Sequence, residues 1–357
     1  MTKKSDAPAI RFKGFSDAWE QRKFEEIAVR SSVICSDDTL PRVEYEDIVS
    51  GTGRLNKDIY AKQSSKSGIV FHQGDVLYGK LRPYLQNWLL PTFDGLAVGD
   101  FWVLQPQNAD SSFLYRLIQS RQFDEVANQS TGTKMPRADW KLVSKTVFSI
   151  PSNISEQAAI GTYFTALDSL ITLHQRKFEK LTNVKKSMLE KMFPQNGSSY
   201  PEIRFKGFTD PWEQRKLGDV VDVRSGKDYK HLSEGNIPVY GTGGFMLSVN
   251  QALSYDEDAI GIGRKGTIDK PYILKAPFWT VDTLFYAIPR EKVDLNFAFD
   301  VFQNIDWKKK DESTGVPSLS KTAINEIDVL VPQYDEQQPL GQFFNRIDNL
   351  ITLHQCE

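Results

Sequence analysis

The feature that most constrains this chain is a long stretch between Ser155 and Phe193 in which seam residues recur at alternating steps of four and three. The seam positions are Ile160, Phe164, Leu167, Ile171, His174, Phe178, Leu181, the polar Lys185, Met188 and Met192. Charged residues occupy most other faces, and such spacing, kept over several heptads, is typical of a coiled-coil helix. A helix of this length needs packing partners. The sequence therefore predicts one long helix at residues 155–193 that pairs with another.

The chain is a tandem repeat, and the repeat supplies the second helix. Leu170-Ile171-Thr172-Leu173-His174-Gln175 returns as Leu350-Ile351-Thr352-Leu353-His354-Gln355, a shift of 180 (350 minus 170). The seam of the second copy is Leu340, Phe344, Ile347, Ile351 and His354. A histidine on a seam is more typical of a packing layer than of a metal site. The two helices are expected to pair with each other.

A second motif precedes each globular part of the chain. Residues 10–23 read IRFKGFSDAWEQRK and residues 203–216 read IRFKGFTDPWEQRK, a shift of 193 (203 minus 10). We expect an extended piece, a glycine turn and a short helical turn capped by Asp17 or Asp210. Trp19 and Trp212 would anchor this lead-in motif to a core.

These repeats define the expected domain organisation, which has the α+β fold class. Two β-rich domains, residues 1–154 and 203–334, are each followed by a long helix, and residues 194–202 form a linker. Short apolar runs bounded by Gly, Pro and Asp predict strands, and each domain has one helical stretch, Phe113 to Ala127 and Asn296 to Lys308. The second helix, residues 335–357, is truncated relative to the first. Since the two β-rich domains differ in sequence while their flanks match, the chain is expected to recognise two different targets at a fixed separation.

Composition limits the classes of function. The 357 residues are 40% hydrophobic and 25% charged, as in globular proteins of more than one domain. The net charge of -2 means that nucleic-acid binding would depend on local basic patches. No apolar run is long enough for a membrane span, and the start lacks a signal peptide. Two cysteines, Cys35 and Cys356, form no disulfide framework or metal motif, so we expect a cytoplasmic, metal-free protein.

Three sets of loop residues recur in corresponding places of the two β-rich domains. The first is Gly-Thr-Gly at 51–53 and 241–243; the second is basic, at 79–84 and 263–267; the third is Ser-Thr-Gly with a nearby basic residue, at 130–137 and 313–321. Glycines allow close approach of a ligand, and Arg and Lys can contact phosphates or base edges. The first set alone is more typical of a turn, and a solvated basic loop is an equal alternative for the second. The candidate DNA-binding residues are Thr52, Lys80, Arg82, Tyr84, Thr131, Lys134, Arg137, Thr242, Arg264, Lys265, Thr267, Thr314 and Lys321.

Nothing in the sequence indicates catalysis. Residues 261–266, GIGRKG, match the dinucleotide fingerprint, but Pro271 prevents the helix that this motif requires. The sequence has no Walker A motif and no recognisable catalytic arrangement, so we expect a non-enzymatic protein.

The duplicated lead-in motifs, the helices SEQAAIGTYFTALDSLITLHQ and DEQQPLGQFFNRIDNLITLHQ, and the Thr-Gly loops resemble the DNA specificity subunit of Type I restriction-modification enzymes. The resemblance covers nearly the whole chain. It implies two target-recognition domains, each reading half of a bipartite site in double-stranded DNA, and two antiparallel helices that separate them. It also implies docking of two methyltransferase subunits, which use S-adenosylmethionine, and of restriction subunits, which use ATP and Mg²⁺. The chain itself would need no cofactor.

The sequence departs from this family in one respect. The first helix continues through Arg176 to Phe193, whereas the second stops at Cys356 and Glu357. The distal seam of the first helix (Phe178, Leu181, Met188, Met192) is then expected to lack a partner, which predicts exposed apolar surface and self-association. The candidate interface residues are Phe164, Leu167, Ile171, Phe178, Leu181, Met188, Phe344, Ile347 and Ile351.

A function of another class remains open from the sequence. The chain could be a coiled-coil adaptor with two protein-binding β-rich domains, which the near-neutral net charge favours. DNA binding would weaken as salt rises, whereas binding by such an adaptor would not show this dependence on phosphate contacts.

Overall fold

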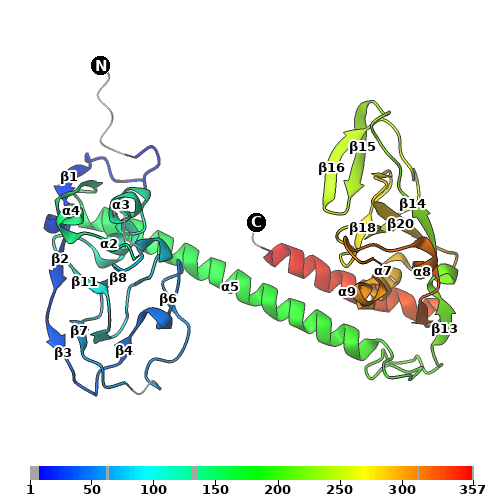
Figure 1. The fold of residues 1–357 in the computed structure, drawn as a ribbon, viewed down its shortest axis with the longest axis horizontal. Coiled ribbons are helices and arrows are strands. Elements are labelled where there is room, and N and C mark those ends of the chain that lie inside the picture. Colours follow the sequence, from blue (N-terminus) through cyan, green and yellow to red (C-terminus); the bar gives the residue numbers. More distant parts are fainter. Residues whose placement is uncertain (1–7, 62–63, 130–134, 312, 356–357) are drawn as a thin grey trace. The chain divides into compact units, whose positions relative to one another are not determined.

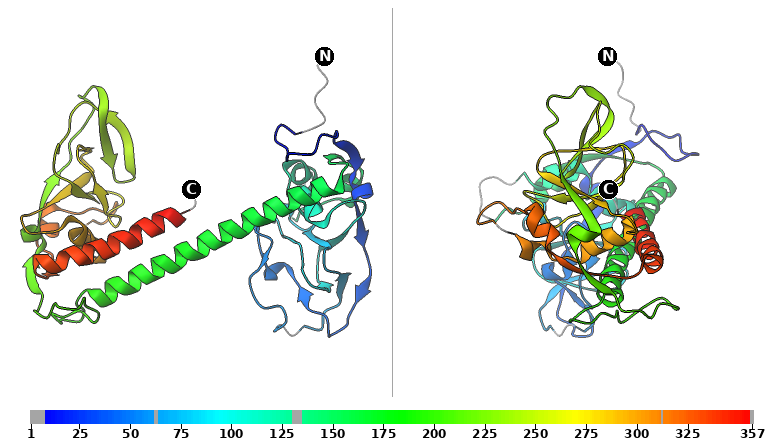
Figure 2. Two further views of the ribbon diagram at one scale, coloured as in Figure 1. Left: turned by 180° about the vertical axis from the view of Figure 1, so that it is seen from behind. Right: turned by 90° about the vertical axis from the view of Figure 1, so that its right-hand side faces the viewer.

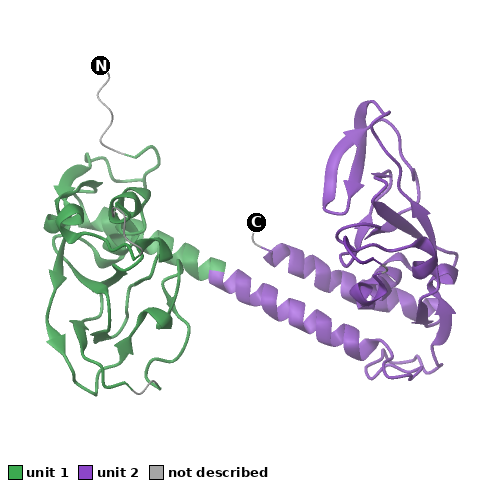
Figure 3. Cartoon of the chain, in the orientation of Figure 1, with its two compact units in different colours: residues 1–171 green, residues 172–357 purple. Residues whose placement is uncertain are grey.

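The chain divides into two compact units, residues 1–171 and 172–357 (Figure 3). The computed structural model describes residues 8–61, 64–129, 135–311 and 313–355. The boundary lies inside helix α5 (Ile154–Met192), so unit 1 contains the N-terminal half of this helix and unit 2 the C-terminal half.

Unit 1 is built on two four-stranded sheets (Figure 1). The antiparallel sheet has the order β2 (Ala28–Ser31), β11 (Phe101–Pro106), β8 (Val76–Gly79), β9 (Trp88–Leu89). The mixed sheet has the order β3 (Ile34–Cys35), β7 (Gly68–Phe71), β10 (Gly95–Ala97), β4 (Arg42–Val43). Two antiparallel pairs complete the unit: β1 (Glu20–Lys23) with β12 (Val147–Ile150), and β5 (Ile48–Val49) with β6 (Arg54–Leu55).

Short helices of unit 1 cover an aromatic core. They are α1 (Phe24–Ile27), α2 (Ser111–Leu117), α3 (Arg121–Ala127) and α4 (Trp140–Lys145), with 3-10 turns η1 (Tyr45–Asp47) and η2 (Pro83–Leu85). Phe24, fully buried, contacts Phe123 and Phe148 with ring centroids 5.2 and 5.7 Å away. The predicted single helix from Phe113 to Ala127 is two helices, because Ser120 caps the start of α3 by accepting a hydrogen bond from Phe123 N.

Unit 2 repeats this scaffold with different inserts. Its four-stranded sheet has the order β14 (Val221–Ser225), β20 (Leu284–Pro289), β17 (Ala259–Gly263), β18 (Tyr272–Leu274). Its three-stranded sheet has the order β16 (Gly244–Val249), β15 (Glu234–Gly241), β19 (Trp279–Thr280). The pair β13 (Glu213–Lys216) and β21 (Asp328–Val331) corresponds to β1 and β12 of unit 1. The helical elements are α6 (Leu217–Val220), α7 (Leu295–Asn304), η3 (Trp307–Lys310), α8 (Lys321–Asn325) and α9 (Tyr334–His354).

The lead-in motif of each unit holds a buried glutamate at the start of the long helix. In unit 1 Arg11 donates two hydrogen bonds of 2.6 Å to Glu156, whose side chain is 1% exposed, and Trp19 Nε1 donates a third. In unit 2 Arg204 and Trp212 make the same contacts with Glu336, at 2.7, 2.7 and 3.4 Å. A bidentate Arg pair of this kind satisfies a buried carboxylate.

The next residue of each helix, a glutamine, connects the helix to its unit. Gln157 Oε1 accepts from Asp110 N at 2.9 Å, and its Nε2 donates to Pro151 O at 2.8 Å. Gln337 makes the same two contacts with Asp294 N and Pro332 O, both at 3.0 Å. The start of each long helix is therefore fixed to its own β-rich unit by side chains that the repeat preserves.

The helical turn predicted within the lead-in motif is wrong. Glu20–Lys23 and Glu213–Lys216 are strands, because their backbones pair with β12 and β21. The glycine turn before them is present, with φ of +102° at Gly14 and +105° at Gly207.

Within unit 2, α9 contacts the C-terminal half of α5 (Figure 2). Leu189 and Met192 of α5 share a core cluster with Leu340 and Phe344 of α9. At the other end of the contact, His174 Nδ1 and His354 Nδ1 are 3.0 Å apart. The two helix segments are therefore antiparallel.

The predicted exposure of the distal seam is wrong. Met192 is buried, Met188 packs on the unit 2 core, and Phe178 and Leu181 are half-buried. Because α9 is antiparallel to α5 and starts beside Met192, it covers the distal residues of α5 within unit 2. Knobs-into-holes packing between the helices stays a prediction.

Replacing Arg11 by Met should lower the melting temperature of the chain by several degrees, because it leaves the buried Glu156 carboxylate without its main partner. The Arg11 guanidinium lowers the pKa of the Glu156 carboxyl. A pair with a depressed carboxyl pKa stabilises the fold above the unfolded pKa and ceases to do so as pH falls through the folded pKa. The difference in melting temperature between Arg11→Met and the wild type should therefore become smaller as the pH is lowered from neutral to acidic values, which thermal melts at several pH values measure.

The matched control is Arg22→Met, since Arg22 pairs with Glu20 at a partly exposed site where ion pairs contribute little. Equal melting temperatures for Arg11→Met and Arg22→Met at neutral pH would contradict the structural role of the Glu156 contact.

Candidate nucleic-acid interface

The basic loop and the third loop of unit 1 lie side by side. Arg82 N donates to Pro136 O at 2.7 Å, and Ala138 N donates to Lys80 O at 2.8 Å. These backbone contacts form a β-bridge between Leu81 and Arg137. Two loops that are far apart in the sequence thus form one surface.

Unit 2 brings its own two loops together in the same way. Gly266 N donates to Pro317 O at 2.9 Å, Leu319 N donates to Arg264 O at 3.0 Å, and Lys265 bridges Ser318. These contacts match those of unit 1 one for one, so Lys80 corresponds to Arg264 and Arg137 to Ser318. We call these joined loops the paired loops of each unit: residues 79–86 with 135–138, and residues 263–267 with 313–321.

An acidic residue distinguishes the paired loops of unit 1. Asp100 Oδ1 is 3.4 Å from Lys80 Nζ, and Asp100 Oδ2 is 3.1 Å from Arg137 Nη2. Its backbone oxygen accepts from Lys80 N, as Thr283 accepts from Arg264 N in unit 2. Position 100 in unit 1 therefore corresponds to a neutral threonine in unit 2. Asp100 lies just after Gly99 and directly before strand β11, and no sequence motif marks it.

A half-buried tyrosine fixes the backbone of the same loop. Tyr45 Oη donates to Asp100 O at 2.6 Å and accepts from Leu81 N at 3.1 Å. Burial raises the pKa of the Tyr45 phenol, so it stays a neutral donor. Arg82, at φ +51°, begins the η2 turn directly after this contact.

In unit 2 a carboxylate fixes the third loop. Asp311 Oδ1 accepts from Ser313 N, Ser313 Oγ and Ser318 N at 2.8 to 3.0 Å. The Ser318 and Ser313 hydrogen bonds lower the pKa of Asp311. The Arg264 guanidinium lies over the Phe285 ring at 5.8 Å and is exposed to solvent.

Both Gly-Thr-Gly segments are hairpin turns, and a turn was the alternative to ligand binding that the sequence favoured for them. Residues 51–53 join β5 to β6, and Gly51 N donates to Gln86 O at 3.0 Å, which places Thr52 beside the paired loops of unit 1. Residues 241–243 join β15 to β16, and Gly241 O accepts from Tyr272 Oη at 2.6 Å. Thr242 is thus held beside β18.

Most of the predicted DNA-binding residues that the structure describes are accessible. The exposed ones are Thr52, Tyr84, Arg137, Arg264, Lys265, Thr314 and Lys321. The half-buried ones are Lys80, Arg82, Thr242 and Thr267. Thr131 and Lys134 lie outside the described residues. Their assignment to DNA stays a prediction.

The predicted interface residues have two kinds of environment. Phe344 and Ile347 are buried in the core of unit 2, with Met188 and Ile351 packed against it. Phe164 and Ile171 of unit 1 are 44% and 46% exposed. Leu167, Phe178 and Leu181 are half-buried.

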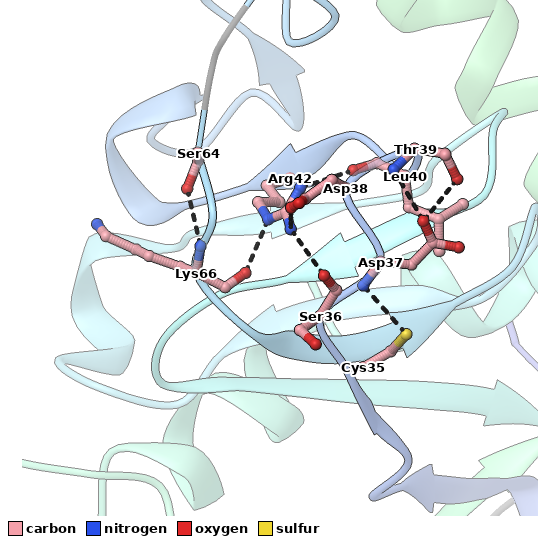
Figure 4. Close-up of polar contacts among 9 residues, drawn as sticks. All are labelled: Cys35, Ser36, Asp37, Asp38, Thr39, Leu40, Arg42, Ser64 and Lys66. Atoms are coloured by element: carbon pink, nitrogen blue, oxygen red, sulfur yellow. Dashed lines mark hydrogen bonds and ion pairs between the residues drawn. The ribbon is translucent and has the colours of Figure 1, made fainter.

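A polar hollow of about 820 Å³ lies in unit 1, and Arg42 and Lys66 are among its lining residues. Arg42 is 5% exposed and donates to Lys66 O, Leu40 O, Ser36 O and the Asp38 carboxylate at 2.7 to 3.4 Å (Figure 4). The guanidinium thereby joins the two loops that border the hollow. Glu44 and Glu46 on the rim disfavour an anionic ligand.

Comparison with known proteins shows similarity to one family. Residues 209–357 match the family described as Type I restriction modification DNA specificity domain. The chain is 24% identical to the specificity subunit of the Type I restriction enzyme MjaVIII from Methanocaldococcus jannaschii, over 76% of this chain and 75% of that protein. It is 25% identical to the specificity subunit of the Type I enzyme EcoDI from Escherichia coli, over 49% of this chain and 41% of that protein. The chain is similar to Type I specificity subunits over most of its length.

Solved structures of Type I specificity subunits share the fold. The S subunit from M. genitalium superimposes with a TM-score of 0.71 at 16% identity, covering 97% of this chain and 93% of that one. A chain from a structure describing complex assembly and conformational transition of the Type I system gives a TM-score of 0.50 at 17% identity. The predicted α+β class, with β-rich units and a long helix followed by a shorter second one, is confirmed.

The relatives that the chain matches are specificity subunits, which supports the expectation of a non-catalytic chain. The glycine-rich segment 261–266 leads to strand β18 and not to the helix that a dinucleotide site requires. Among the described residues, no helix is long and apolar enough to cross a membrane, and no group of His, Cys, Asp or Glu side chains could hold a metal ion.

Proposed function

We propose that this specificity subunit reads a bipartite DNA target, one half with the paired loops of each unit. The single observation that supports this is the identical backbone connection of the paired loops in two units whose loop side chains differ. A conserved backbone frame with variable side chains suits a surface that contacts phosphates uniformly and reads different bases. The sequence read depends on those side chains.

The assembly and its cofactors follow as further parts of this proposal. The chain docks two methyltransferase subunits, which use S-adenosylmethionine, and restriction subunits, which use ATP and Mg²⁺, while it binds no cofactor itself. Its near-neutral net charge is compatible with DNA binding when partner subunits supply part of the phosphate contacts. Because the target is genomic DNA, we place the assembly in the cytoplasm.

Co-expression with a Type I methyltransferase subunit, followed by genome-wide mapping of methylated adenines, tests the proposal. We expect a split motif of two short, different halves around a fixed gap. A motif with only one defined half, or methylation that is independent of sequence, would contradict it.

Asp100→Asn should raise non-specific DNA affinity several-fold and steepen its salt dependence. The change removes the carboxylate that lies against Lys80 and Arg137, so both cations become available to phosphates. Binding of scrambled duplexes, measured by fluorescence anisotropy at several salt concentrations, gives both quantities.

Thr283→Asp is the reciprocal control, since it introduces a carboxylate at the equivalent position of unit 2. It should weaken binding and flatten the salt dependence. If neither variant changed the salt dependence, the paired loops would not be the phosphate-contacting surface.

A further inference from the structure

The first of the two paired loops turns through a left-handed residue at the same position in both units. In unit 1 this residue is Arg82, at φ +51°, and in unit 2 it is Gly266, at φ +87°. The two positions correspond because Arg82 N donates to Pro136 O in the same way as Gly266 N donates to Pro317 O. The backbone path therefore has a left-handed residue here whichever side chain the loop carries.

Glycine is the residue that suits such a position. A left-handed backbone costs glycine little, whereas in any other residue the Cβ atom is crowded against the following carbonyl oxygen. Arg82 also precedes Pro83, and the residue before a proline normally has an extended backbone, which the φ of 51° and ψ of 65° at Arg82 do not give. Unit 1 thus has a strained arginine where the backbone favours glycine, and strain of this kind gathers at functional sites.

No polar contact inside the chain offsets this strain. Among the residues that the structure describes, the Arg82 side chain has no ion-pair partner and its buried Nε has no hydrogen-bond partner. The other two cations of the unit 1 paired loops, Lys80 and Arg137, both lie against Asp100, at 3.4 and 3.1 Å. Arg82 is therefore the cation of these loops whose N–H groups remain available to a ligand.

The backbone that carries this guanidinium is held on both sides. Leu81 N donates to Tyr45 Oη at 3.1 Å, Arg82 N donates to Pro136 O at 2.7 Å, and Leu85 N donates to Arg82 O at 2.9 Å. A phosphate contact needs only a cation near the surface, whereas a guanine edge needs two N–H groups at fixed places. A restrained, half-buried arginine without an internal partner suits the second task.

We propose that Arg82 donates two hydrogen bonds to O6 and N7 of a guanine in the half of the target that unit 1 reads. This inference rests on the proposed function of the paired loops. Unit 2 has a glycine at the corresponding position, so the guanine requirement belongs to one half of the target only. The strain at Arg82 is the cost of presenting a guanidinium from a position that the shared backbone path reserves for glycine.

The variant Arg82→Lys tests the role of the guanidinium, because lysine keeps the charge and loses the two-pronged donor. The whole chain, as wild type or variant, is co-expressed with a Type I methyltransferase subunit, and methylated adenines are mapped across the genome. We expect discrimination for one guanine in one half of the motif to fall about tenfold or more, with the other half unchanged.

The same map contains the results that would overturn this inference. Unchanged discrimination at every position, or an equal loss at all positions, would show that Arg82 contacts a phosphate or no DNA at all. A wild-type chain that gives no split motif would refute the proposed function and this inference with it, so the two failures are distinguishable.

A duplex in which 7-deazaguanine replaces that guanine identifies the contacted edge, because it lacks the N7 acceptor. The complex of the wild-type chain with its methyltransferase subunit should bind this duplex several-fold more weakly than the unmodified one, as measured by fluorescence anisotropy. The complex with Arg82→Gly should bind the two duplexes equally. Equal losses for the wild type and Arg82→Gly would overturn the assignment.

Thermal melts separate a functional role of Arg82 from a structural one. Arg82→Gly should raise the melting temperature of the chain by about two degrees, because it relieves the left-handed strain. Lys292→Gly is the matched control, since Lys292 is a cationic residue at φ +63° outside the paired loops. It should raise the melting temperature similarly and leave the methylated motif unchanged. A lower melting temperature for Arg82→Gly would show that the arginine is kept for stability and would overturn the proposal.

Discussion

The buried glutamate at the start of each long helix is the contact on which the rest of the structure depends. A carboxylate that is 1% or 2% exposed requires partners, and the lead-in motif supplies a bidentate arginine and an indole N–H in both units. The adjacent glutamine binds the backbone before its own helix and the N-cap residue of an earlier helix, α2 or α7. The start of each long helix is therefore held at a defined place on its own β-rich unit.

At the paired loops, backbone contacts are the same in both units whereas the side chains differ. Backbone hydrogen bonds join the loops, so side chains at positions such as 80, 82 and 137 can change without loss of the frame. Unit 1 has Asp100 beside two cations, whereas unit 2 has Thr283 and a guanidinium over Phe285. Two units with one backbone frame can thus have different electrostatics and different targets.

The sequence repeats predicted the fold well because the heptad spacing is regular and the duplicated segments are nearly identical. The heptad spacing gave the long helix, and the constant shifts gave two β-rich units with a shorter second helix. Local propensity failed where tertiary pairing decides: the capped turn expected at Asp17 is followed by strand β1, which pairs with residues 147–150 far along the chain. The direction of the second helix also mattered, since an antiparallel α9 covers the distal residues of α5 that were expected to be exposed.

The candidate site was predictable in part. Recurrence in otherwise different units pointed to two sets of loops that the structure joins in both units. Their contact with DNA stays a prediction. Asp100, Tyr45 and Asp311 were missed because their roles depend on the approach of distant backbone groups, which no local motif records.

The central claim is that each unit reads its half of the target independently on a common frame. Exchange of residues 217–334 for the corresponding segment of another Type I specificity subunit, followed by mapping of methylated adenines, tests it most directly. The account predicts that one half of the motif changes while the other half stays the same. A change in both halves would contradict it.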